Sequence, residues 1–217
     1  NESESIEAVH TPLQSIRNDQ LIDIILVDGG SHDDTLKKSK PLADKVITSQ
    51  KGRSLQMNAG AECSVGDVLL FLHADTLLPK NFYSILHQLS ENKDVLWGFF
   101  PVRLSGQHWL FRVIERAINS RSRLTSVATG DQALFISRSL FENVGQFPEI
   151  SLMEDVAMSK LLRDVKSPCI AKGFVQTSSR LWEKNGIIKT IFLMWMLRLQ
   201  YFLGVNPESL VKTYYGK

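Results

Sequence analysis

Cysteine is scarce in this sequence, and features typical of secreted or membrane-spanning chains are missing. The 217 residues include two cysteines, Cys63 and Cys169, which give neither a disulfide framework nor metal-ligand spacing. No uncharged apolar run reaches the roughly 18 residues that a transmembrane helix needs. No signal peptide opens the sequence. These absences predict a cytoplasmic protein whose cysteines are small, buried residues.

Net charge is also low, because 25 Lys and Arg face 23 Asp and Glu for a total of +2. Such a balance argues against a general nucleic-acid binder. The positive charge is concentrated in residues 180–217, which hold six Lys or Arg and two Glu, a net +4. No repeat, low-complexity stretch or linker rich in Pro, Gly or Ser interrupts the chain. The sequence therefore predicts a single domain over residues 1–217.

Short apolar runs alternate with helical patterns. The run 22–27 is aliphatic without alternation, which is typical of a parallel strand covered on both faces. This alternation predicts an α/β fold with a mostly parallel central sheet flanked by helices. Further strands are predicted at 45–48, 68–72, 96–104, 133–137 and 169–177. Helices are predicted at 1–16, from 33, at 52–63, from about 79, and at 108–119, 155–164, 187–203 and 207–214.

Two of the predicted strands end in an aspartate, Asp28 and Asp75. Each fits a turn or capping residue, but both at one sheet edge favour a shared polar site, because ligands bind beyond the carboxyl ends of parallel strands. Alternation along an extended segment places His73 on the same side as Asp75. An imidazole and a carboxylate so placed suit a divalent cation that also binds a diphosphate.

Two adjacent carboxylates, Glu154 and Asp155, open a predicted helix. Carboxylates at a helix start commonly cap it and interact favourably with its dipole. The alternative is a general base near the site, where low polarity and the helix dipole shift its pKa in opposite directions. The residues alone leave both interpretations open.

Longer motifs resemble those of family 2 glycosyltransferases, which have the GT-A fold. More narrowly, they resemble the bacterial subfamily associated with radical-SAM and selenium-related genes. The resemblance covers nearly the whole chain. It rests on residues 27–31, 52–60, 66–76, 119–125, 130–133, 147–148, 152–155, 177–182 and 193–195.

The resemblance implies a role for each matching position. Asp75 is the last residue of the family's metal-binding Asp-x-Asp, while His73 replaces its first aspartate and would bind metal or phosphate. The expected ion is Mg²⁺ or Mn²⁺. Asp155 matches the catalytic base of inverting enzymes, with Glu154 supporting it. The implied donor-binding residues are Asp28, Gly30, Arg53, Asn58, His73 and Asp75, and the implied acceptor-side residues are Asp131, Gln132, Arg180 and Trp182.

The predicted function is metal-dependent, inverting transfer of a sugar from a nucleotide-diphosphate donor to an unidentified acceptor hydroxyl. A cation would stabilise the leaving nucleotide, and a carboxylate would take the acceptor proton. Residues 180–182 only approximate the Gln-x-x-Arg-Trp of processive synthases, so we infer no processivity. A nucleotidyltransferase of similar fold and a non-catalytic nucleotide-binding or membrane-attached protein are the alternatives.

Both ends of the sequence carry a further expectation. The family's opening strand ends in Pro-x-x-Asn-Glu, and Asn1 and Glu2 fit its last two residues, so we expect another strand upstream of Asn1. The predicted helix 187–203 is apolar with Lys189 and Arg198. Together with the +4 charge, it predicts peripheral contact with the inner face of the cell membrane or a lipid-linked acceptor. An ordinary core helix is the alternative.

Overall fold

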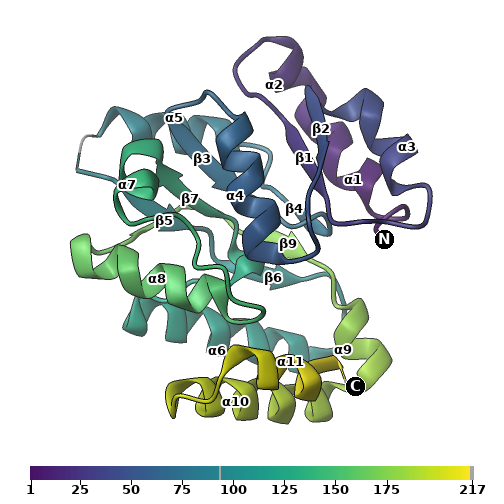
Figure 1. Cartoon of the computed structure of the whole chain (residues 1–217), viewed down its shortest axis with the longest axis vertical. Coiled ribbons are helices and arrows are strands. Elements are labelled where there is room, and N and C mark those ends of the chain that lie inside the picture. The colour runs from purple at the N-terminus through teal and green to yellow at the C-terminus, as the bar shows by residue number, and fades with distance from the viewer. Residues whose placement is uncertain (93, 216–217) are drawn as a thin grey trace.

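The computed structural model describes residues 1–92 and 94–215, in which helices surround three small sheets (Figure 1). The first sheet pairs β1 (Ile25–Asp28) with β2 (Lys45–Thr48) in parallel. Beside it lie α1 (Ile6–His10), α2 (Gln14–Asn18) and α3 (Thr35–Ser39). The predicted helix over 1–16 is broken by a 3-10 turn, η1 (Thr11–Leu13), in which Pro12 has no N–H to donate.

The second sheet has the order β3 (Val68–Phe71), β7 (Leu134–Ser137), β5 (Trp97–Phe99) and β8 (Cys169–Ile170). The third has the order β4 (Thr76–Leu77), β9 (Val175–Thr177) and β6 (Val102–Leu104). The predicted strands 96–104 and 169–177 are therefore each two short strands that belong to different sheets. Pro101 interrupts the first, since it cannot donate to a ladder. Gly173, with φ +115°, turns the second.

The α/β class is confirmed, but the pairing is more mixed than the predicted, mostly parallel sheet. Within the described residues, β1–β2, β5–β8 and β6–β9 are parallel, whereas β3–β7, β5–β7 and β4–β9 are antiparallel. Because short strands follow one another from one sheet into the next, the second and third sheets combine parallel and antiparallel strands.

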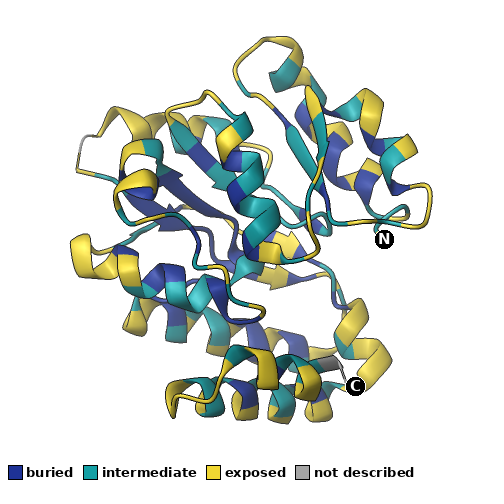
Figure 2. Ribbon diagram, viewed as in Figure 1, coloured by how far each residue is buried: buried dark blue, intermediate teal, exposed yellow. Residues whose placement is uncertain are grey.

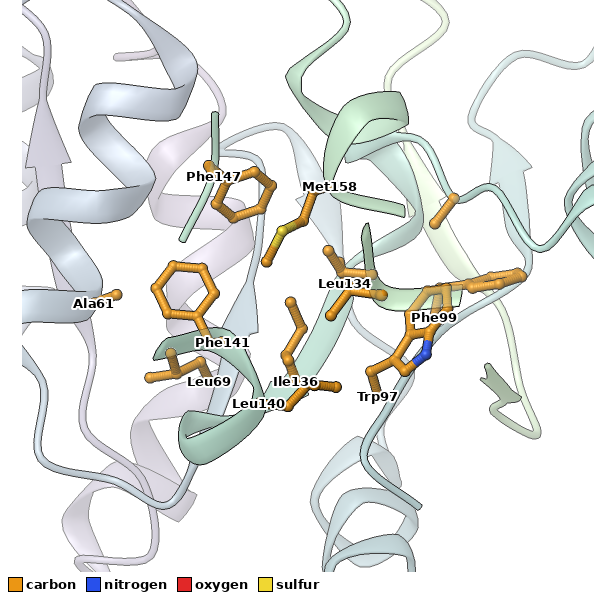
Figure 3. Packing of buried hydrophobic residues seen from close by; sticks show 12 residues of the cluster. Ala61, Leu69, Trp97, Phe99, Leu134, Ile136, Leu140, Phe141, Phe147 and Met158 are labelled. Atoms are coloured by element: carbon orange, nitrogen blue, oxygen red, sulfur yellow. The ribbon is translucent and has the colours of Figure 1, made fainter. Parts of the chain in front are cut away.

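Aromatic packing holds the second sheet against the helices around it (Figure 3). The rings of Phe71 and Phe147 meet edge to face at 4.9 Å, and Phe141 lies 5.8 Å from Phe147. Met158 of α8 (Glu154–Val165) packs into the same cluster. Burial of each such side chain contributes about 1.5–3 kcal/mol. This cluster fixes the start of α8 near the end of β3.

A cavity of about 810 Å³ lies between β1 and β3. Aliphatic side chains from both strands line it, together with residues of α4 (Arg53–Cys63) and α5 (Phe82–Glu91). Within the described residues, β1 pairs only with β2 and β3 only with β7, so one edge of each strand has no neighbour. The expected strand upstream of Asn1 is neither confirmed nor contradicted and stays a prediction.

The C-terminal helices pack below the third sheet (Figure 1). They are α9 (Arg180–Asn185), α10 (Ile187–Phe202) and α11 (Pro207–Tyr215), next to α6 (Trp109–Thr125). Leu197 of α10 and Leu210 of α11 are buried against Leu152 and Met153, while much of the outer side of α10 is exposed (Figure 2). None of the helices in the described part has the length and hydropathy needed to span a bilayer.

Candidate functional site

Asp28 closes β1 and is buried. Its Oδ2 atom accepts hydrogen bonds of 2.9 Å from the backbone N–H groups of both Gly30 and Ser31. Burial raises the pKa of Asp28, but the hydrogen bonds from Ser31 and Gly30 outweigh it and leave the pKa below its ordinary value. Gly30 has φ +93°, a left-handed conformation that glycine adopts without strain. An ionised Asp28 thus organises the turn at the edge of the site.

His73 and Asp75 follow β3 and line the cavity, as do Glu2 and Arg53, whose charges act on His73. We call these four residues the charged end of the cavity. The His73 imidazole lies so close to Gly130 that a Cβ there would be 2.4 Å from its Nε2 atom. Burial, and then the charge of Arg53, lower the pKa of His73 to about 4. The neutral imidazole therefore keeps a lone pair available to a metal or a hydrogen-bond donor.

Asp75 lies among other carboxylates. Burial, and then the charge of Glu2, raise the pKa of Asp75, with a further rise from Asp131, while Arg180 opposes them. Crowded carboxylates favour a bound cation, which relieves their repulsion. No group of three or more His, Cys, Asp or Glu side chains within the described residues is arranged to hold a metal. The chain would thus supply Asp75 and at most His73, and diphosphate and water would complete the shell of a Mg²⁺ ion.

The start of α8 presents the two adjacent carboxylates differently. Glu154 is 3% exposed, and its Oε1 lies 4.0 Å from Nη1 of Arg53. Burial, and then the charge of Asp155, raise the pKa of Glu154. Asp155 is half-buried, and its Oδ2 accepts a 2.9 Å hydrogen bond from the backbone N–H of Gly130. Both line a pocket of about 40 Å³ next to His73.

Backbone strain accompanies this arrangement. Met153 directly precedes α8 with φ +69°, a left-handed conformation that costs a non-glycine residue about 1–3 kcal/mol. Burial of its side chain in the cluster with Leu197 and Leu210 helps to hold it there. The strained residue aims Glu154 and Asp155, so the α10–α11 pair supports the position of both carboxylates.

Two predicted binding residues make hydrogen bonds that hold parts of the fold together. Gln132, expected on the acceptor side, is 0% exposed, and its Oε1 accepts hydrogen bonds from Ser122 Oγ and Thr129 N–H. The side chain of Gln132 is thus enclosed within the fold, and its expected acceptor role stays a prediction. Asn58, expected to bind the donor, bonds with both side-chain polar groups to the backbone of Phe147. These bonds fasten α4 to that loop, and the expected donor role of Asn58 stays a prediction.

The other three predicted acceptor residues differ in their surroundings. Asp131, in the short 3-10 turn η3 (Gly130–Gln132), has a buried Oδ1 without a hydrogen-bond partner among the described residues. Arg180 is exposed, and its Nη2 lies 3.0 Å from Oε2 of Glu2. Trp182 is half-buried against the cluster of Leu104, Phe111 and Ile114, which indicates a packing role.

Sequence reasoning missed several groups that the fold brings to the site. The charge of Glu2 acts on both His73 and Asp75. In the sequence, Glu2 stands out only as part of the opening motif. Arg121 and Arg198 lie where the charges of Asp131 and Asp155 act on them. A basic residue within an apolar helical run, as Arg198 is, was the available signal. The pairing with Arg121 depends on tertiary structure.

Solved structures of similar fold include glycosyltransferases. S. aureus TarS 1–349 superimposes with a TM-score of 0.63 at 16% identity, covering 82% of this chain and 58% of TarS 1–349. M. tuberculosis glucosyl-3-phosphoglycerate synthase gives a TM-score of 0.58 at 16% identity, with coverages of 82% and 68%. The mannosyltransferase PcManGT from Pyrobaculum calidifontis, in complex with GDP-Man and Mn²⁺, gives 0.55 at 16%, with coverages of 80% and 53%. These TM-scores indicate a shared fold, and at 16% identity the likeness extends to the fold alone.

A search of curated proteins finds no match. The family model described as "Glycosyl transferase family 2" matches residues 1–145, which include the turn after β1, the start of α4 and the segment with His73 and Asp75. Glu154 and Asp155 lie beyond the matched residues. The match covers more than half of the sequence, and the chain belongs to glycosyl transferase family 2.

Proposed function

We propose that the protein transfers a sugar, with inversion, from a nucleotide-diphosphate donor to an acceptor hydroxyl, and that the reaction depends on a divalent cation. The observation that carries the proposal is the convergence of a half-buried Asp155 with His73 and Asp75 at one end of the sheets. The neighbour solved with GDP-Man and Mn²⁺ supports the same class of donor and ion. The subfamily associated with radical-SAM and selenium-related genes is proposed on the sequence motifs alone.

The donor side is assigned to Asp28, Gly30, Arg53, His73 and Asp75. Asp28 shapes the turn that faces the nucleoside, and Gly30 leaves space there, since an added Cβ would meet nothing within 4 Å. Arg53 is 52% exposed at the start of α4, a position where a guanidinium and a helix N-terminus both attract phosphate. A divalent cation at Asp75 supplies charge stabilisation for the leaving diphosphate.

The acceptor side is assigned to Asp155, with Glu154, Asp131 and Arg180 around it. The Gly130 N–H holds Oδ2 of Asp155 in place, so the carboxylate is oriented before the acceptor arrives. Asp155 accepts the proton of the acceptor hydroxyl while the oxygen attacks the anomeric carbon from the face opposite the diphosphate. Glu154, whose pKa is raised by burial and then by Asp155, lies next to that carboxylate at the start of α8 and supports its role.

Product analysis tests the proposal most directly. The enzyme is incubated with UDP-, GDP- and TDP-sugars and Mn²⁺, and the released nucleotide is identified by chromatography. We expect release of a nucleoside diphosphate with one class of donor. No release is expected when the metal is left out. Release of pyrophosphate would assign a nucleotidyltransferase instead. Binding of a nucleotide without release of any product would favour a non-catalytic nucleotide-binding protein.

The same proposal includes a cytoplasmic location, with peripheral contact at the inner face of the cell membrane and a lipid-linked acceptor. The exposed apolar stripe of α10 supports it. Phe192, Trp195 and Phe202 are 72%, 75% and 79% exposed, and they recur at helical spacing along one face. Exposed aromatic side chains along one face of a surface helix are typical of interfacial binding.

A further inference from the structure

A buried hydrogen-bond network centres on Gln132, the last residue of η3, whose side chain is 0% exposed. Its Oε1 atom accepts a 2.8 Å hydrogen bond from Oγ of Ser122. The same atom accepts hydrogen bonds from the N–H and the Oγ1 of Thr129, at 3.0 and 3.2 Å. Its Nε2 atom donates to the carbonyl oxygen of Phe100 at 3.5 Å. One side chain thus connects α6, the loop after β5 and the turn η3.

The backbone of Gln132 bonds to the same neighbours. Its N–H donates to the carbonyl of Thr129, and its carbonyl accepts from the N–H of Phe100, both at 2.8 Å. The next residue, Ala133, is fully buried and has φ +45°, a left-handed conformation that is unfavourable for a residue other than glycine. Such a conformation persists where the surrounding structure enforces it, and it is frequent at active sites. The network around Gln132 therefore holds the shape of η3.

Gly130, the first residue of η3, contacts two residues of the candidate site. Its N–H donates the 2.9 Å hydrogen bond to Oδ2 of Asp155. A Cβ at Gly130 would be 2.4 Å from Nε2 of His73, so the turn packs against the imidazole with no room for a side chain. His73 and Asp155 also line the same pocket of about 40 Å³. The position of η3 therefore determines where the Asp155 carboxylate lies relative to His73.

We propose that Gln132 is a positioning residue, whose hydrogen bonds hold η3 so that the Gly130 N–H orients Asp155 toward the acceptor hydroxyl. This inference rests on the proposed function and deepens it, because it gives a buried residue a role in catalysis that needs no contact with substrate. A carboxylate that is oriented before the acceptor binds needs no rearrangement during the reaction. The N–H of Val156 bonds to Oδ1 of Asp155, so different elements hold the two oxygens, and Gln132 controls the contact to Oδ2.

Gln132→Met keeps the length of the side chain and removes its hydrogen-bonding groups. We expect kcat to fall by about ten- to a hundredfold, because misplacing a reacting group by about 1 Å can cost about 10²-fold in rate. The donor KM and the calorimetric affinity for a nucleoside diphosphate with Mn²⁺ should stay constant. The network joins α6, the loop after β5 and η3, whereas Arg53 and Asp75 belong to other elements.

Asn119→Leu is the matched control. Asn119 lies on the same helix as Ser122, and its side chain forms two hydrogen bonds with the backbone of Val102, at 2.9 and 3.0 Å. This variant also loses buried hydrogen bonds, but they fasten α6 to β6 rather than to η3. It should lose stability and keep the kcat of the wild type.

A double-mutant cycle shows whether Gln132 acts through Asp155. The Asp155→Asn enzyme already lacks the base, so adding Gln132→Met should change its residual kcat by less than about threefold. Additive losses in the double variant would overturn the inference, because Gln132 would then act by another route. An unchanged kcat in the single Gln132→Met variant would also overturn it.

Hydrogen exchange at the Gly130 amide tests the contact without turnover. The amide should exchange about tenfold faster in Gln132→Met than in the wild type or Asn119→Leu, roughly the effect of one hydrogen bond. If Gln132→Met does not fold, Ser122→Ala removes a single donor and should shift both kcat and exchange in the same direction by about twofold or more. Equal Gly130 exchange in the wild type and the network variants would overturn the inference. Faster exchange in the variants of an enzyme without turnover would overturn the proposed function and retain the positioning of Asp155.

Discussion

Asp155 is held by two backbone N–H groups, those of Gly130 at 2.9 Å and of Val156 at 2.7 Å. Asp155→Asn keeps the shape of the side chain and removes its basicity. We expect kcat to fall by about 10² to 10⁴, the range for general-base catalysis. Donor affinity should stay nearly constant, since the base acts on the acceptor. Initial rates and calorimetry of the same preparation measure the two effects.

Glu154→Gln is the matched control for that variant. Successive helical residues point about 100° apart, so one of the two carboxylates faces a given hydroxyl. The buried Glu154 should affect kcat less than Asp155. An active Asp155→Asn enzyme beside an inactive Glu154→Gln enzyme would reverse the two roles.

The raised pKa of Glu154 leads to a prediction of how the stability of the fold depends on pH. Burial, and then Asp155, raise its pKa above the ordinary value of 4.5, so the folded chain holds this proton more tightly than the unfolded chain. Its contribution to the free energy of unfolding is therefore full below pH 4.5 and is lost as pH rises through the folded pKa. Thermal unfolding between pH 4 and pH 8 should show Glu154→Gln gaining stability relative to the wild type as pH increases. Parallel curves for the two proteins would contradict this account.

Asp75 is the chain's main candidate for holding a cation, because it is partly buried and the charges of Glu2 and Asp131 add negative potential around it. Asp75→Asn should abolish the gain in nucleoside diphosphate affinity that Mn²⁺ gives the wild type. Calorimetry with and without the metal measures it. Asp67→Asn, a change outside the charged end of the cavity, is the control. An undiminished metal effect in Asp75→Asn would remove Asp75 from the metal site.

At the scale of elements, local sequence patterns predict the bounds of a strand or helix well where its own residues determine them. The bounds of β2, α4, α8 and α10 lie within one residue of those expected. The segments 96–104 and 169–177 were not resolved into two strands each, because their division depends on which sheet each half joins. Long-range contacts were equally hidden. Glu2 reaches Arg180 across 178 positions, and nothing local distinguishes that pairing.

The outer stripe of α10 leads to a prediction about membranes. Phe192→Ser combined with Trp195→Ser should strongly reduce co-sedimentation with anionic vesicles at low salt, because both side chains are exposed apolar anchors. Neither substitution removes the buried Leu197 contact, so the fold should persist. The control is Val65→Ser, which changes a 78% exposed residue far from α10 in the sequence. No vesicle binding by the wild type would contradict membrane contact.

At the scale of the whole molecule, the cavity between β1 and β3 divides the sheets. Its volume of about 810 Å³ is lined by Leu26 and Val27 on one side and Leu70 and Leu72 on the other. Facing edges without a strand neighbour leave backbone polar groups unpaired, which is unfavourable and invites another strand. Glu2 lies at one end of the cavity, and the Asn1 amino group is 3.3 Å from Ser31 Oγ, just past β1. A strand leading into Asn1 would run parallel to β1 and end at the same edge.

We therefore propose that this cavity accepts a short apolar strand that pairs with the facing edges of β1 and β3. A chain with a designed apolar strand of roughly ten residues added before Asn1 should be more stable, because several newly buried side chains contribute about 1.5–3 kcal/mol each before the entropy of ordering them is subtracted. For a protein of this size, a net gain of about 2–3 kcal/mol corresponds to a rise in Tm of about 5–10 °C. Hydrogen exchange should show new protection of the β1 and β3 amides, with β2 changing less because its pairing with β1 already exists.

Leu70→Lys, which puts a charge in the cavity wall, should remove most of the gain, whereas Val65→Lys on the exposed surface should leave it intact. Equal Tm and unchanged protection in the extended chain would show that the two edges are not bridged by this segment.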